Sequence, residues 1–280
     1  IHVVKKLVKV FLKAGFSSGD LDWSGLNNLK EAKPELLLKE NLDKSLKLLM
    51  YLKLLKRGKE IAVGLEVGEI GSRSTTVEEL KWFLDNLKKK VELGTIAKIA
   101  VQTGTSHGGK VDEKGNLLSM PIDLKQLKLL NDIAQKAGFY GVVQHGASTL
   151  PLEILKQLPN TGVLEVHLGT AFQNLVFDHP EFPSELKTKI YSWLDEKFAS
   201  KRKLPQPKGH GIFFPRKENN IYSEIKPNQT KEQFFYEIRK QAWGEFRKEF
   251  WELPEEFKIK IVEAMKEKTG EIFKALTIIS

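Results

Sequence analysis

The sequence predicts an α/β protein with a parallel sheet, followed by a helical extension. Short apolar runs rich in Val and Ile alternate with amphipathic helical patterns up to about residue 180. The runs are apolar on both faces, as buried parallel strands are, and strand–helix repeats imply right-handed crossovers. An open doubly wound sheet and a (β/α)8 barrel both fit this alternation. No GxGxxG follows any strand, which disfavours a Rossmann fold.

The elements expected in this part are bounded by Gly, Ser, Thr and Pro. The expected strands are 19–23, 61–67, 96–102, 141–144 and 163–168. The expected helices are 35–56, 76–93, 124–137 and 151–158. The helix at 76–93 opens with Thr-Val-Glu-Glu, a capping sequence with acidic residues in the first turn.

The pattern changes after about residue 180, so the chain divides into a barrel portion at 1–180 and a helical extension at 181–280. The extension is expected to hold a helix at 184–198, a basic loop at 199–231 rich in Pro, Gly and Asn, and two helices at 231–251 and 254–278. The first of these two helices carries Phe234, Phe235, Trp243, Phe246, Phe250 and Trp251. They have too little partner surface of their own, so we expect a homo-oligomer formed through the C-terminal helices.

Composition excludes several classes of protein. The 280 residues carry a net charge of +9 but no cysteine, which rules out disulfides and thiolate metal ligands. The lysines are spread along helices beside many acidic residues, and no nucleic-acid-binding motif is present, so we expect a solubilising surface and no nucleic-acid partner. No apolar run is long enough to cross a membrane, and no signal peptide is evident, so a cytoplasmic location is expected.

Four polar residues lie where predicted strands end. They are Glu66, His107, His145 and His167. Because carboxyl ends of parallel strands meet on one side of the fold, these groups are expected to point at one place. Imidazoles with a carboxylate, and no thiols, suit a divalent metal with an open coordination position.

Small residues beside these groups predict a second kind of site. Glycines with adjacent hydroxyls expose backbone N–H groups, and such loops bind phosphate. The candidate phosphate-binding residues, with two possible cationic donors among them, are Gly108, Lys110, Gly146, Ser148, His167, Gly169 and Thr170.

At these residues the chain resembles the class II (metal-dependent) fructose-bisphosphate aldolase family, from about residue 4 to residue 174. The order and spacing of five segments carry the resemblance. They are AGFSS at 14–18 with LDWS at 21–24, LEVGEIG at 65–71, GTSHG at 104–108, HGAS at 145–148 and the strand end at 166–173.

The resemblance implies a (β/α)8 barrel, a divalent metal that is usually zinc, and retro-aldol cleavage of a ketose bisphosphate. By resemblance, His107 and His145 are metal ligands and Glu66 is an alternative or second-site ligand. The family's third metal histidine lies upstream of AGF, where this chain has His2. About six strand positions are counted rather than eight, so the first strands of the barrel are expected to be missing from this sequence.

The proton-transfer residues depart from the family pattern. Its acidic pair is replaced by Ser72-Arg73-Ser74, which leaves Glu69 as the nearest substitute. Asp22 is the other candidate catalytic residue. The sequence thus predicts a lyase acting on a phosphorylated ketose, fructose 1,6-bisphosphate first. The alternatives are a sugar-phosphate isomerase or epimerase with the same enediolate chemistry, and a non-catalytic sugar-phosphate-binding barrel.

Overall fold

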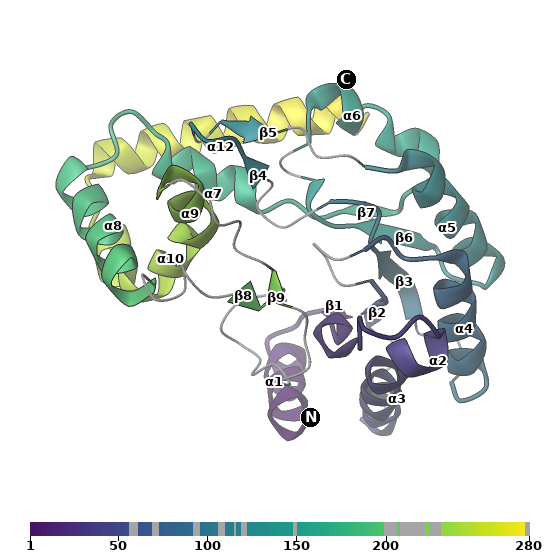
Figure 1. Ribbon diagram of the computed structural model, residues 1–280. Helices are drawn as coiled ribbons and strands as arrows, with labels where there is room; N and C mark the ends of the chain where they lie inside the picture. The colour runs from purple at the N-terminus through teal and green to yellow at the C-terminus, as the bar shows by residue number, and fades with distance from the viewer. Residues whose placement is uncertain are drawn as a thin grey trace.

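A parallel sheet of five strands forms the centre of the protein in the computed structural model (Figure 1). The structure describes residues 1–55, 61–68, 73–91, 96–105, 110–114, 116–118, 122–147, 150–198, 206–207, 222–223 and 231–277. In this part of the chain, no helix has both the length and the apolarity needed to span a membrane.

The strands of the central sheet are β1 (Ser18–Leu21), β2 (Ala62–Glu66), β3 (Ile96–Val101), β6 (Gly141–Gln144) and β7 (Glu165–Val166). Two small antiparallel pairs consist of β4 (Lys110–Val111) with β5 (Leu117–Leu118) and β8 (Gln206–Pro207) with β9 (Tyr222–Ser223). The helices up to β7 are α1 (His2–Lys13), α2 (Pro34–Leu37), α3 (Lys39–Leu54), α4 (Val77–Lys88), α5 (Leu124–Lys136) and α6 (Leu152–Leu155). The later helices are α7 (Thr170–Phe177), α8 (Ser184–Phe198), α9 (Lys231–Ile238), α10 (Ala242–Glu245), α11 (Arg247–Trp251) and α12 (Glu255–Ala275).

The order of the sheet is β1-β2-β3-β6-β7, and every neighbouring pair is parallel. Each strand therefore lies beside the next one in the sequence, without the reversal of order that defines a doubly wound sheet. The five predicted strands and their parallel pairing are confirmed. The described strands form a half-barrel, and the complete eight-stranded barrel stays a prediction.

The crossover helices begin where side chains cap them. The Thr76 hydroxyl accepts a hydrogen bond from the Glu79 N–H at 3.2 Å, and the Glu79 carboxylate accepts one from the Thr76 N–H at 2.9 Å. This is the capping box that the sequence predicts for α4. The Asp123 carboxylate caps α5 through the Gln126 N–H at 2.8 Å. Gly138 follows α5 with a φ of 98°, a left-handed conformation that favours glycine.

The two faces of the sheet differ in chemistry. Alternate residues of each strand face α3, α4 and α5 and form the main hydrophobic core; in β2 and β3 they include Val63, Leu65, Ile99 and Val101. The residues between them face the opposite way, which we call the inner face of the sheet. Because side chains alternate along a strand, the inner face receives the polar residues Asp20, Glu66, Lys98, Glu165 and His167.

The extension has a hydrophobic core of its own. Its members come from α7 to α12 and include Phe177, Ile190, Phe234 and Phe257. The aromatic rings pack closely, with Phe177 and Trp243 at 5.3 Å between ring centroids. Helix α12 runs from this bundle along the sheet domain to α6 and contributes Ile272 and Ala275 to the main core (Figure 1).

Two expectations for the extension are therefore wrong. Phe234, Phe235 and Phe246 are buried within the chain, and Trp243 and Phe250 pack against the same core, so these residues do not require a second subunit. Trp251 is 76% exposed, and a homo-oligomer stays a prediction. The single helix expected at 231–251 is divided into α9, a 3₁₀ turn, α10 and α11. It breaks at Phe246, whose ψ of 29° lies outside the helical region, two residues after Gly244.

Replacing Gly64 by alanine is expected to destabilise the protein by about 1–3 kcal/mol. A Cβ at this position would lie 2.0 Å from Asp20 Oδ1 and 3.0 Å from Lys98 Cε, so it would push apart two side chains that meet above β2. Urea unfolding measures the change. Gly19→Ala is the matched control, because the added Cβ lies within 4 Å of no atom in the described part of the chain, its chain neighbours apart. Equal stability of both variants would contradict the expected clash.

Candidate active site

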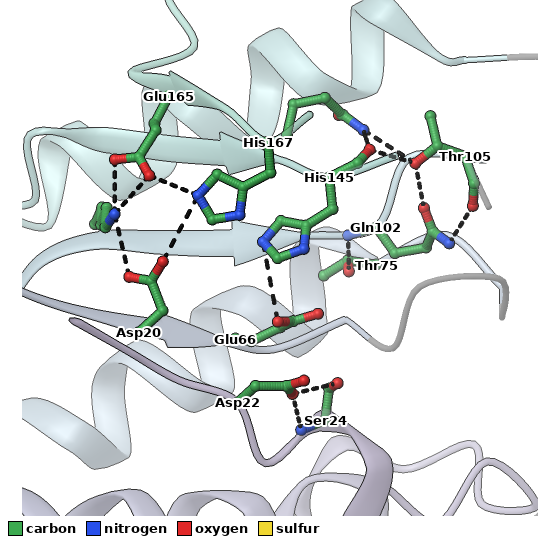
Figure 2. Close-up of polar contacts among 12 residues, drawn as sticks. Asp20, Asp22, Ser24, Glu66, Thr75, Gln102, Thr105, His145, Glu165 and His167 are labelled. Atoms are coloured by element: carbon green, nitrogen blue, oxygen red, sulfur yellow. Dashed lines mark hydrogen bonds and ion pairs between the residues drawn. The ribbon is translucent and has the colours of Figure 1, made fainter. Parts of the chain in front are cut away.

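A carboxylate and an imidazole meet at the carboxyl ends of β2 and β6. Glu66 is the last residue of β2, and His145 directly follows β6. His145 Nε2 lies 4.0 Å from Glu66 Oε2, and the two side chains are only 13% and 4% exposed (Figure 2). The inner face of the sheet thus places two good metal-ligand types next to each other with little access to water.

A second histidine ring lies beside the first. The ring centroids of His145 and His167 are 4.3 Å apart, and the planes are tilted by 45°. His167 follows β7, the strand next to β6, so the parallel pairing of these strands brings the two rings together. The structure thus brings together Glu66, His145 and His167 from three predicted strand ends (Figure 2).

A network of charged groups holds His167. Its Nε2 lies 2.5 Å from Glu165 Oε1 and 3.6 Å from Asp20 Oδ2. The Lys98 ammonium donates to both oxygens of Glu165, at 2.7 and 2.6 Å, and lies 3.1 Å from Asp20 Oδ1. Asp20, Glu165 and His167 point toward one another in Figure 2. These residues link β1, β3 and β7 across the inner face.

The network keeps Lys98 and Glu165 charged. Burial acts to lower the pKa of Lys98, but the hydrogen bond to Glu165 and the charge of Asp20 outweigh it, so the pKa lies above its ordinary value. Burial acts to raise the pKa of Glu165, but the hydrogen bonds from Lys98 and His167 outweigh it and the pKa is lowered. Lys98 is therefore an ammonium and Glu165 a carboxylate at neutral pH.

Buried amides connect the two loops that carry the predicted metal histidines. The Gln102 amide donates to the Thr105 carbonyl at 2.7 Å, and the Thr105 hydroxyl donates to the His145 carbonyl at 2.9 Å. The Gln144 amide donates to the same carbonyl at 2.6 Å, and its oxygen accepts from the Thr103 hydroxyl at 2.7 Å. These hydrogen bonds fix Thr105, two residues before His107, against the backbone of His145.

Two predicted phosphate-binding residues lie at a helix N-terminus. Gly169 is the N-cap of α7 and Thr170 its first residue, so this helix begins three residues after His167. Unpaired N–H groups and the helix dipole at such an end favour anions. Gly146 directly follows His145 in the sequence, and its φ of 68° is a left-handed conformation suited to glycine.

Two further candidates lie in the first part of the chain, before β2. His2 is exposed in the first turn of α1, at the end of that helix away from β1 (Figure 1), and is not brought to Glu66 and His145. Asp22 accepts hydrogen bonds from the Ser24 N–H at 2.9 Å and hydroxyl at 2.7 Å, so it caps a short turn after β1. Their ligand and catalytic roles stay predictions.

Other candidates lie outside the described residues: Glu69, His107, Gly108 and Ser148. Of Lys110 only the backbone, in β4, is described. Conversely, Lys98 and Glu165 were not predicted from the sequence. Two signals were available. Glu165 and His167 are two residues apart, so they lie on the same face of a strand, and Lys98 interrupts the apolar run IAKIAV.

The sequence matches the family model described as fructose-bisphosphate aldolase class-II over residues 2–210. This match agrees with the fold, a parallel half-barrel, and with the site, a histidine and a carboxylate at the strand ends. The chain belongs to the class II fructose-bisphosphate aldolase family, whose members depend on a divalent metal. No curated protein sequence matches the chain.

The chain is similar to several solved structures. The fructuronate-tagaturonate epimerase UxaE from Cohnella laeviribosi aligns with a TM-score of 0.64 and 13% identity, over 98% of this chain and 66% of that one. A putative fructose-1,6-biphosphate aldolase from Coccidioides immitis aligns with a TM-score of 0.43 and 18% identity, over 87% and 66%. The fructose-bisphosphate aldolase from Campylobacter jejuni aligns with a TM-score of 0.41 and 19% identity, over 86% of this chain and 63% of that one. This chain thus spans about two thirds of the length of these proteins.

The pKa shifts predict how stability depends on pH. Glu165 has a lowered pKa, so its contribution is present above the ordinary value of 4.5 and is lost as the pH falls through the lowered one. Lys98 has a raised pKa, so its contribution is present below 10.5 and is lost as the pH rises through the raised one. The stability difference between the wild type and Glu165→Gln should therefore shrink as the pH falls below about 4.5 and as it rises above about 10.5.

Urea unfolding across this range is the measurement. Glu153→Gln is the matched control, because the Glu153 side chain is 78% exposed and pairs only with a surface lysine among its described contacts. A difference for Glu165→Gln that does not respond to pH would show that the ion pair with Lys98 does not contribute to folding.

Proposed function

We propose that this protein is a metal-dependent lyase that cleaves a phosphorylated ketose, fructose 1,6-bisphosphate being the first candidate, by a retro-aldol reaction. The observation that carries the proposal is the Glu66–His145 pair at the carboxyl ends of β2 and β6, in a chain of the class II aldolase family. The non-catalytic alternative does not account for a buried carboxylate and imidazole held together on the inner face.

The residues of this pair fit a divalent metal. Ligand atoms of one zinc ion lie about 2.0–2.2 Å from it, so two of them are at most about 4.4 Å apart. The 4.0 Å between His145 Nε2 and Glu66 Oε2 falls within this limit. His145, Glu66 and the sequence-predicted ligand His107 would hold the ion. When bound, it supplies a Lewis acid that polarises a substrate carbonyl and stabilises an enediolate.

The chain's own groups account for binding and orientation. Gly169 and Thr170 at the start of α7 would bind a phosphate group through backbone N–H donors, assisted by Ser148 and Gly146. The substrate carbonyl would then face His145, because α7 begins close after His167 and the two rings are in contact. The hydrogen bonds from Thr105 and Gln144 to the His145 carbonyl would keep that ring in place.

Proton movement needs separate groups. In retro-aldol cleavage a base removes the proton of the hydroxyl next to the bond that breaks, and an acid protonates the enediolate carbon afterwards. Glu69 and Asp22 are the sequence-predicted groups for these two transfers. The Asp22 Oδ1 atom already accepts two hydrogen bonds from Ser24, so Glu69 is the stronger candidate for the base.

An epimerase is the second candidate, favoured by one observation. His167 lies against the His145 ring and is oriented by Glu165, so the site offers an additional acid–base group beside the proposed metal ligand. Such a group suits removal and return of a proton without cleavage of a carbon–carbon bond. Release of triose phosphate from the ketose bisphosphate distinguishes a lyase from an epimerase, which would return only a stereoisomer.

Replacing His145 by alanine is expected to remove the bound metal and lower kcat/KM by more than about 100-fold, because loss of a direct ligand costs more than loss of an outer-shell partner. Metal analysis of the purified variant and a coupled triose-phosphate assay measure both effects. His2→Ala should keep metal and activity, since His2 is exposed on α1. Normal metal content in His145→Ala, or loss of metal in His2→Ala, would contradict the proposed ligand set.

Replacing Thr170 by aspartate is expected to raise KM by roughly tenfold or more, because a carboxylate at the start of α7 repels the substrate phosphate. The helix itself should tolerate the change, since acidic residues are favourable in a first turn. Thr170→Asn is the matched control, because asparagine has the shape of aspartate without its charge. Steady-state kinetics of both variants is the test, and equal KM values would place the phosphate elsewhere.

A further inference from the structure

A second group of metal-ligand atoms lies next to the proposed metal site. Asp20, Glu165 and His167 each offer one ligand atom, and these atoms all lie within 4.8 Å of one another. Two carboxylates and an imidazole form a donor set that divalent metals accept. Two neighbouring clusters, Glu66 with His145 and Asp20 with Glu165 and His167, therefore both have ligand atoms suited to a divalent metal ion.

The second cluster already contains a cation, the ammonium of Lys98. It lies 2.6 Å from Glu165 Oε2 and 3.1 Å from Asp20 Oδ1, so it is bound by both carboxylates of the group. The Lys98 side chain is 7% exposed, whereas those of Asp20 and Glu165 are 32% and 39% exposed. The ammonium is thus more deeply buried than the two carboxylates and lies between them and the sheet.

The backbone makes room for this arrangement. Asp20, Gly64 and Lys98 are paired in register on β1, β2 and β3, so the ion pair passes over Gly64. The space where a Cβ of residue 64 would lie is taken by Asp20 Oδ1. Glu165 reaches the same ammonium from β7, at the other edge of the sheet.

We infer that Lys98 is an internal cation that takes the place of a metal ion among Asp20, Glu165 and His167, and so confines the divalent metal to the site of Glu66 and His145. The location of that metal rests on the proposed function, whereas the exclusion by Lys98 does not. His167 Nε2 faces Glu165 at 2.5 Å, so His167 belongs to the Lys98 cluster and is a positioning neighbour of His145.

Manganese binding tests this inference. Wild-type protein and Lys98→Met, both stripped of metal with a chelator, are titrated with Mn²⁺ in a calorimeter, and the bound ion is counted by elemental analysis. We expect one Mn²⁺ per chain in the wild type and a second one in Lys98→Met, because two carboxylates are left without their cation. The double variant Lys98→Met/Asp20→Asn should return toward one ion, since it lacks a carboxylate ligand.

Lys156→Met is the matched control, because it removes a lysine whose side chain is 56% exposed and pairs with Glu153 on the surface. It should bind like the wild type. A folded Lys98→Met variant that binds no more Mn²⁺ than the wild type would overturn the inference.

If the unpaired carboxylates prevent Lys98→Met from folding, thermal unfolding provides the test. Mn²⁺ should then restore folding, with a larger rise in Tm for Lys98→Met than for the wild type, because a ligand that binds only the folded state stabilises it. No rise in Tm would overturn the inference. His145→Ala in the same titration separates the two claims. Loss of the wild-type ion in His145→Ala tests whether the metal lies at Glu66 and His145, and a second ion in Lys98→Met tests whether Lys98 excludes a metal.

Discussion

One buried ammonium group joins the two edges of the sheet. Lys98 lies on the central strand β3, Asp20 on the edge strand β1 and Glu165 on the edge strand β7. Each edge strand is two strands away from β3, and neighbouring strands are about 4.8 Å apart, so long side chains and a curved sheet are needed for the three groups to meet. The ion pairs therefore depend on the curvature of the half-barrel, and its inner face is built around them.

This constraint organises the candidate site. The more buried pair, Glu66 and His145, lies at the carboxyl ends of inner strands, and His167 connects it to the ion-pair network. The hydrogen bonds from Gln144 and Thr105 hold the His145 backbone from the other side. A reactive group oriented from two directions is pre-organised, which is the physical requirement for catalysis by electrostatic stabilisation.

Much of this fold follows from local sequence patterns. Runs of Val and Ile between glycines locate the five strands, and the Thr76 and Glu79 pair locates the start of α4. Helix α7 was missed because its residues, TAFQNLVF, have no charged face and read as the end of a strand. The turn at Phe246 inside the aromatic segment depends on tertiary packing, which periodicity does not report.

The site was predictable only in part for a similar reason. Glu66, His145 and His167 follow strands, and the rule that strand ends meet at one edge brings them together. The role of Lys98 depends instead on three distant segments and on the space above Gly64, and a lone lysine in an apolar run gives no sign of its partners. The exposed position of His2 likewise follows from where α1 lies and not from its neighbours in sequence.

The most direct test of the account is anomalous diffraction from crystals of the protein soaked in zinc. We expect a single strong peak about 2.0–2.2 Å from His145 Nε2, with a Glu66 oxygen in the same coordination sphere and Lys98 still bound by Asp20 and Glu165. A peak among Asp20, Glu165 and His167, with Lys98 displaced, would contradict it.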